Sequence, residues 1–178
     1  MASEIIVQTI KAPTSGANAN KVIIPSGVTL DASAGTLKPP AGHIVQAVSH
    51  SWSSETNTTS NSYVDIQGGS ISFTPKYSDS TVVVQVLMHI RFDGAVNNGG
   101  GCRIVWNGNV ISNTANYANY DNHNVNTYQG YAIGGMFTSG TTSATTLKVQ
   151  SSLHGSGNFW INWSGNFQSN MTVMEIAQ

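Results

Sequence analysis

The segment from Thr81 to Phe92 constrains the fold most, because apolar residues alternate along its whole length. Its even-numbered residues are all apolar and share one face of an extended strand, whereas its odd-numbered residues are mixed. The pattern predicts a central strand about 40 Å long with one buried face. Val83 and Leu87 make the second face too apolar for open water, so we expect a subunit interface there.

Further strand patterns begin at Ile44 and are divided by Gly, Asn and Ser. A β-hairpin is expected over residues 103–111, because Asn107-Gly108 readily supplies the positive φ angles of a type I′ turn. The other expected strands are residues 63–66, 70–74, 128–137, 145–153, 159–163 and 171–176. No segment has sustained helical periodicity. The sequence therefore predicts an all-β, jelly-roll-like antiparallel β-sandwich.

The domain organisation is expected to be an arm, residues 1–40, followed by a β-sandwich head, residues 41–178. The arm contains only short apolar pieces separated by Pro- and Gly-rich turns, and such strands are stable only against a partner. Pro39-Pro40 stiffens the chain at the boundary. We therefore expect residues 1–40 to anchor the protein in an assembly.

The composition points to the same conclusion, because only 8% of the residues are charged, against about 25% in typical soluble domains. A net charge of -1 gives little self-repulsion. The 7 Lys and Arg residues are scattered, so we expect no nucleic-acid binding. Neither a signal peptide nor a membrane-spanning stretch is expected, and Cys102, the only cysteine, is expected to be buried.

Catalytic and metal-binding motifs are missing from the sequence, so we expect neither an enzyme nor a cofactor. A glycosidase-like pair of carboxylates assembled in space is the weaker alternative. The histidines lack metal-ligand spacing. Three copies of His89 could meet at a trimer axis and hold a metal, but a packed imidazole is the favoured interpretation, so no metal site is predicted.

Residues 113–131 form a polar segment rich in Asn and Tyr, which predicts a recognition loop. Tyr offers a flat apolar ring and Asn offers both a donor and an acceptor, a mixture that suits sugars and protein surfaces. The candidate receptor-binding residues are Tyr117, Tyr120, Asn122, Asn124 and Tyr128. The alternative is a surface loop whose tyrosines pack on their own scaffold. Trp160 and Trp163 are expected in the core or an interface.

Several segments resemble the distal domain of structural proteins of marine and cyanobacterial phages, often tail-fibre tips. They are Tyr63–Ile66, Ile71–Lys76, Ser78–Val84, Met174–Ile176 and, in the arm, Lys21–Leu30. The resemblance implies a trimeric, jelly-roll-like head on a phage particle, without catalytic residues. The protein would then be a virion component assembled in the host cytoplasm, and its arm would join a tail adaptor or the major capsid protein.

Two functions follow from the resemblance. The first is a host-attachment adhesin that touches a surface glycan or protein. Such fibres commonly have a long shaft, which we do not expect from this sequence, so a capsid decoration protein or short head fibre is the alternative. In either case we expect a homotrimer. Its interface residues are expected on the strands that carry apolar residues on both faces: Val83, Leu87, His89, Met174 and Ile176.

Overall fold

The computed structural model describes residues 39–93, 98–113, 119–121 and 126–178, together with residues 12, 14–17, 22, 26 and 27. The chain divides into two units, Met1–Lys38 and Pro39–Gln178. The expected arm therefore lies largely outside the described residues, and its anchoring role stays a prediction. The fold described below is that of the second unit, which we call the head.

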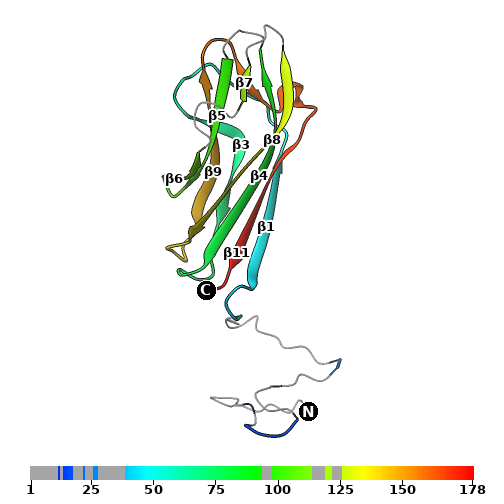
Figure 1. The fold of residues 1–178 in the computed structure, drawn as a ribbon, viewed down its shortest axis with the longest axis vertical. Coiled ribbons are helices and arrows are strands. Elements are labelled where there is room, and N and C mark those ends of the chain that lie inside the picture. Colours follow the sequence, from blue (N-terminus) through cyan, green and yellow to red (C-terminus); the bar gives the residue numbers. More distant parts are fainter. Residues whose placement is uncertain are drawn as a thin grey trace, which may run out of the picture. The chain divides into compact units, whose positions relative to one another are not determined.

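The head is a sandwich of two antiparallel β-sheets, which form the two layers seen in Figure 1. Sheet A contains β1 (Ile44–Trp52), β11 (Ser169–Ile176), β4 (Thr81–Phe92) and β8 (Thr127–Thr138), with β10 (Phe159–Ile161) beside the end of β4 and β2 (Thr56–Thr58) beside β10. Sheet B contains β3 (Val64–Phe73), β9 (Thr145–His154), β5 (Asn98–Trp106) and β6 (Asn109–Asn113), and β7 (Asn119–Asp121) also pairs with β5.

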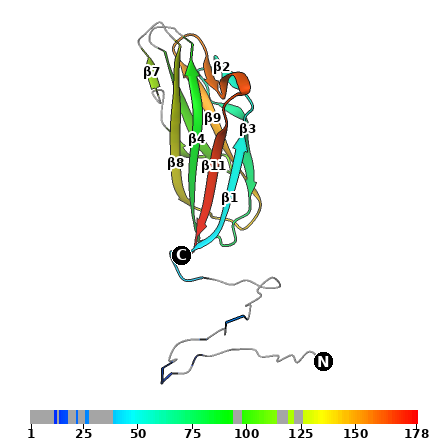
Figure 2. The same ribbon diagram turned by 90° about the vertical axis from the view of Figure 1, so that its right-hand side faces the viewer.

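The strand order is that of a jelly roll, which confirms the predicted fold class. Figure 2 shows β1, β11, β4 and β8 side by side in sheet A. The three-residue strands β2, β7 and β10 are left out of the following count of the described strands. Along the chain, β1 is then the first strand, β11 the last, β4 the third and β8 the sixth. Sheet B pairs the second with the seventh and the fourth with the fifth. Long connections therefore cross between the sheets, and a single core fills the space between them.

The core forms on the even-numbered face of β4, as the alternation predicted. Val82, Val84 and Phe92 are at most 1% exposed, and they belong to one cluster with Leu147 of β9. Cys102 is buried in the same cluster, and burial raises the pKa of its thiol to about 12. The thiolate form is therefore negligible near neutral pH, and the residue acts as a small apolar side chain.

The expected hairpin is present between β5 and β6. Asn107 and Gly108 have φ angles of 48° and 81°, as a type I′ turn requires. The prediction of two strands at residues 63–66 and 70–74 was wrong, because residues 64–73 form the single strand β3. Gly68 and Gly69 lie at a shift in the register with β9, so the glycines bulge the strand instead of ending it.

Glu175 of β11 is fully buried and holds the loop between β3 and β4. Its carboxylate accepts hydrogen bonds from the backbone N–H groups of Lys76 and Tyr77, both 2.9 Å, and from the Ser80 hydroxyl at 2.7 Å. The side-chain amide of Gln46 donates a further bond of 2.6 Å. Burial alone would raise the pKa of Glu175, but these hydrogen bonds outweigh it and lower the pKa below its ordinary value.

The Glu175 carboxylate connects the C-terminal strand to the loop between β3 and β4. The segments 71–76 and 78–84 are neighbours in the chain, whereas 174–176 is far from both, and Glu175 joins it to Lys76 and Ser80. Among the described residues, no helix has the length and apolarity needed to cross a membrane.

Candidate functional site

The outer face of sheet A carries an apolar row near the end where the last residues of β11 pair with β1. Register places Val83 of β4 between Met174 of β11 and Met136 of β8, and Ala47 of β1 beside Met174. We call these four residues the apolar row. Met136 is 70% exposed, which is unusual for a side chain of this size and type.

The five expected interface residues all lie on the outer face of sheet A. Val83 and Met174 belong to the apolar row, and Ile176 lies one step closer to the end of the sheet. Leu87 is 54% exposed farther along β4. His89 lies beyond Leu87, where its ring stacks on Phe167 at 4.9 Å. Their role in a trimer stays a prediction.

At the opposite end of the same face, aromatic side chains gather around Arg91. Tyr128 of β8 and Trp160 of β10 are its partners in the register of the sheet. The guanidinium carbon of Arg91 lies 4.2 Å from the centre of the Trp163 ring, 5.5 Å from Tyr128 and 5.9 Å from Trp160. These distances are within the range of cation–π attraction. We call these four residues the Arg91 cluster.

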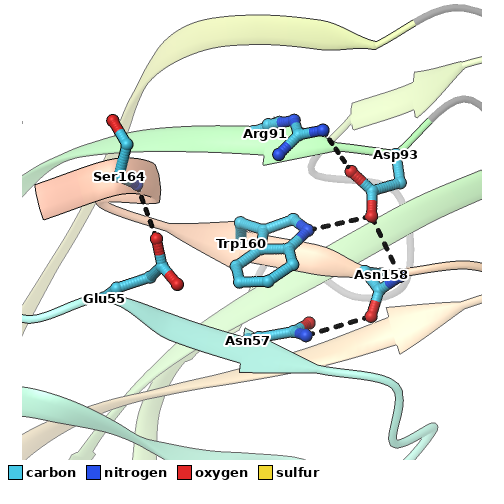
Figure 3. A network of polar contacts seen from close by, with 7 residues as sticks. All are labelled: Glu55, Asn57, Arg91, Asp93, Asn158, Trp160 and Ser164. Atoms are coloured by element: carbon cyan, nitrogen blue, oxygen red, sulfur yellow. Dashed lines mark hydrogen bonds and ion pairs between the residues drawn. The ribbon is translucent and has the colours of Figure 1, made fainter.

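Asp93 fixes the Arg91 cluster through a polar network (Figure 3). Its carboxylate pairs with Arg91 Nη2 at 2.7 Å and accepts hydrogen bonds from Trp160 Nε1 at 3.1 Å and Asn158 Nδ2 at 2.9 Å. The Asn158 side-chain oxygen in turn accepts a bond of 3.0 Å from Asn57 on β2. The network draws on β4, β10 and β2, so the guanidinium is held in place before any ligand arrives.

Trp163 reaches the cluster because the chain leaves sheet A between β10 and β11 and forms a 3₁₀ helix, η2 (Trp163–Gly165). Asn162 and Ser164 have φ angles of 54° and 66° around this turn. The buried Asn162 side chain donates to the Trp52 carbonyl at 3.0 Å and accepts from the Ser169 hydroxyl at 2.7 Å. The Glu55 carboxylate accepts the backbone N–H of Ser164 at 2.5 Å (Figure 3).

This arrangement corrects the strand that was predicted around the two tryptophans, whereas their expected place in an interface stays a prediction. Residues 159–163 were expected to form one strand, with Trp160 and Trp163 in the core or an interface. The strand instead ends at Ile161, and Trp163 lies in η2. Neither tryptophan belongs to the core cluster of the described head, because Trp160 is on the outer face of β10 and Trp163 packs over Arg91.

A pocket of about 200 Å³ lies next to the cluster. Two aromatic pairs line it: Tyr128 with Trp163, whose ring centres are 5.5 Å apart, and His89 with Phe167. Gly130 is the partner of His89 in the register, and a Cβ atom built on it would meet nothing within 4 Å. The missing side chain of Gly130 therefore leaves the space that the pocket occupies.

The outer face of sheet B is different. The Asp65 carboxylate receives Lys148 Nζ and Gln150 Nε2, both within hydrogen-bond distance, and the hydrogen bond from Lys148 is the main reason that its pKa is lowered. Arg103 donates to Gln150 at 2.7 Å and lies 4.3 Å from the centre of the Tyr63 ring. This face is polar along β3 and β9.

Of the five candidate receptor-binding residues, Tyr128 is the one whose side chain is described, and its role in recognition stays a prediction. Tyr128 is half-exposed and belongs to the Arg91 cluster, although it lies on β8 and not in a loop. Tyr117, Asn122 and Asn124 lie outside the described residues, and only the backbone of Tyr120, in β7, is described. Arg91, Trp160 and Trp163 were not predicted. The sequence signal for this site was on the odd-numbered face of β4, where His89 is followed two residues later by Arg91.

In the described parts of the chain, no group of three or more His, Cys, Asp or Glu side chains could hold a metal ion. The Arg91 cluster and its pocket present the faces of aromatic rings, with polar groups at the edges of the rings. Such a surface can bind a small ring or a protein side chain without performing a reaction on it.

No protein-family model matches the sequence, and no curated protein matches it. Several solved structures resemble the fold. Dimeric latent PorU from Porphyromonas gingivalis has 7% identity and a TM-score of 0.46, with 90% of this chain and 15% of PorU covered. A structure of infectious bursal disease virus, Gx strain, has 12% identity and a TM-score of 0.40, with 87% of this chain and 42% of the viral chain covered.

The CBM22-1 xylan-binding domain of Paenibacillus barcinonensis Xyn10C has 13% identity and a TM-score of 0.34, with 80% of this chain and 99% of that domain covered. These likenesses are distant and concern the β-sandwich. The fold assignment given above rests on the strand order and register of this chain.

Proposed function

We propose that this chain is a non-enzymatic structural protein of a bacteriophage virion, and that its head attaches the particle to a host surface. The observation that carries the proposal is the exposed Arg91 cluster at the end of sheet A away from the first residues of β1. Ile44 of β1 pairs with Ile176 of β11, so the chain enters the head and leaves it at the same end. A head anchored through residues 1–40 could then present the Arg91 cluster outward.

Three further features support an attachment role. The charge-poor composition suits a protein that is held in an assembly. The segments quoted in the sequence analysis resemble tail-fibre tips. Asp93 fixes Trp160 and Arg91 of the cluster, and preorganised side chains bind with little loss of side-chain entropy.

A homotrimer is part of this proposal. The apolar row presents Met136 and Met174 on a strand surface, and a second copy of the chain could cover it. Three heads would bring three Arg91 clusters to one particle site. Weak contacts at each cluster could then add up through avidity.

The second candidate is a capsid decoration protein, and the apolar row is compatible with it. A capsid subunit could cover this surface just as well as a second head. In that case the head would clamp the shell, and the arm would spread over capsid subunits.

The experiment that tests the proposal locates the protein on purified phage particles by antibody labelling and cryo-EM. We expect label at the tail, and purified full-length protein should compete with phage for adsorption to host cells. Label spread over the capsid, with no competition, would favour decoration instead. A protein missing from purified particles would contradict both candidates.

A further inference from the structure

The pocket beside Gly130 has the dimensions of a site for a single ring. Its volume of about 200 Å³ is below the range of about 300 to 1,000 Å³ that is usual for drug-sized ligands. We propose that it binds one neutral pyranose ring of a host surface glycan. The inference rests on the attachment function and names the ligand class for it.

The lining of the pocket matches the two kinds of surface that a pyranose presents. One face of a pyranose is made of C–H groups, which pack on aromatic rings. The pocket provides such rings in Tyr128 with Trp163 and in Phe167 with His89. The hydroxyl groups at the rim of a sugar need donors and acceptors; Arg91, whose side chain is on the outer face, and the strand segment at Gln129 line the same pocket.

The charge of the pocket favours a neutral ring over an acidic one. Arg91 is the cationic side chain nearest to the rings, but Asp93 is paired with it at 2.7 Å. The Arg91 side chain is 12% exposed, and much of its surface faces Trp163. A carboxylate ligand would meet the negative charge of Asp93 as well as the positive charge of Arg91, so the pair offers it no net attraction. A neutral sugar can use the guanidinium as a donor without breaking this pair.

Gly130 is the residue that keeps the pocket open. Any side chain on it would enter the space between the aromatic pairs, because its Cβ position is free of contacts. A β-branched residue is also compatible with a strand. Gly130→Val should therefore fill the pocket and leave β8 folded, which makes it a test of the site that does not remove any candidate contact.

The experiment uses the full-length protein and saturation-transfer NMR with the methyl glycosides of glucose, galactose, mannose, rhamnose and N-acetylglucosamine. We expect at least one of them to bind with a millimolar Kd. Gly130→Val should weaken binding about tenfold or more, the size expected when ring stacking is lost. Ser72→Val, the same kind of change on the outer face of sheet B, should bind as the wild type does. Methyl glucuronide should bind more weakly than the corresponding glucoside.

A second variant guards against a folding defect. Phe167 is 36% exposed, and Phe167→Ala removes the ring that stacks on His89. It should cause a similar loss of binding. If no neutral pyranoside binds the wild-type protein, or if Gly130→Val and Phe167→Ala both bind unchanged, the inference is wrong.

The two proposals can fail separately. If the protein competes for phage adsorption but no pyranoside binds, the attachment function stands and its ligand is not a neutral sugar. If a pyranoside binds at the pocket but the protein is missing from virions, the sugar site stands and the virion function is wrong.

Discussion

The outer faces of the two sheets use the same kind of contact in different surroundings. On sheet A, Arg91 lies 4.2 Å from the centre of the Trp163 ring, and on sheet B, Arg103 lies 4.3 Å from the centre of the Tyr63 ring. Arg103 is held by Gln150, whereas Arg91 is held by Asp93. The arginine–aromatic pair by itself therefore does not distinguish a binding surface from an ordinary strand surface.

The difference comes from the interruption of a strand. In the Tyr63 pair, Arg103 lies on β5, which pairs with β9 without a shift in register, and its neighbour there is the polar residue Gln150. The Trp163 pair forms where the chain leaves sheet A between β10 and β11, so that η2 stands over the end of β4. Together with a glycine at position 130, this departure creates a pocket lined by rings. A regular sheet presents a flat surface, whereas the irregular connection between β10 and β11 forms one wall of a pocket.

A matched pair of substitutions tests most directly whether the outer face of sheet A, and not that of sheet B, binds the host. Trp163→Ala should weaken adsorption of the protein to host cells at least about tenfold, because stacking and cation–π attraction contribute about 1 kcal/mol each. Avidity would enlarge the loss in a trimer. Tyr63→Ala removes the corresponding ring from sheet B and should leave adsorption unchanged. Labelled full-length protein and flow cytometry would measure both.

Equal losses in the two variants would contradict the assignment of function to sheet A. A control for folding is the thermal melt. Neither residue belongs to the core cluster of the described head, so both variants should unfold as a single transition close to that of the wild type.

A second test asks whether the apolar row, at the other end of sheet A, forms the trimer interface. Met136→Lys places a charge in the apolar row, and burying an unpaired charge at an interface is costly. We expect light scattering to change from the mass of three chains to that of one. Ser72→Lys adds the same charge to the outer face of sheet B and should leave the trimer intact. A wild-type protein that is monomeric at micromolar concentration would contradict the proposed assembly.

The core of the fold could be predicted because it depends on local alternation. The even-numbered residues of β4 are buried where the pattern placed them, and Asn107-Gly108 forms the expected turn. The merged strand β3 was missed because Gly68-Gly69 is compatible with either a turn or a bulge. Pairing with β9 decides between the two, and such pairing is not visible in a single sequence.

The candidate site was harder to predict because it depends on residues that are far apart in the chain. Arg91 and Tyr128 become neighbours only through the register of β4 with β8, and Trp163 joins them only because Asn162 and Ser164 turn the chain out of the sheet. The sequence emphasised an Asn- and Tyr-rich segment by composition. Composition singled out Tyr128 as a candidate, but it could not show which residues surround it.

A third test separates stability from recognition. Glu175 lies inside the head at the end away from the Arg91 cluster, and Glu175→Gln replaces an oxygen acceptor with a donor facing several donors. Hydrogen bonds to charged groups contribute about 1.5 to 3 kcal/mol, so we expect a loss of about 2 to 3 kcal/mol in the free energy of unfolding. Adsorption measured well below the melting temperature should not change. Chemical denaturation of both proteins would provide the comparison.

The same carboxylate predicts a pH dependence. Because the pKa of Glu175 is lowered in the folded protein, its contribution is present above its ordinary pKa of 4.5 and is lost as the pH falls through the folded value. The wild-type melting temperature should therefore fall as acid is added below about pH 4.5, and Glu175→Gln should show a flatter profile. Parallel profiles for the two proteins would remove Glu175 as the cause.

The smallest expected effect concerns the ion pair on sheet B. Lys148→Ala removes the partner that lies 2.9 Å from Asp65, and exposed pairs of this kind contribute about 0 to 1 kcal/mol. The pKa of Asp65 should rise toward its ordinary value, although the hydrogen bond from Gln150 keeps part of the shift. NMR titration of the Asp65 carboxyl would measure this rise. Because the lowered pKa stabilises the fold only above the ordinary pKa of Asp65, any loss of stability should appear near neutral pH and vanish in acid. A loss of adsorption in Lys148→Ala would mean that sheet B also contacts the host, and the contrast between the two faces would then fail.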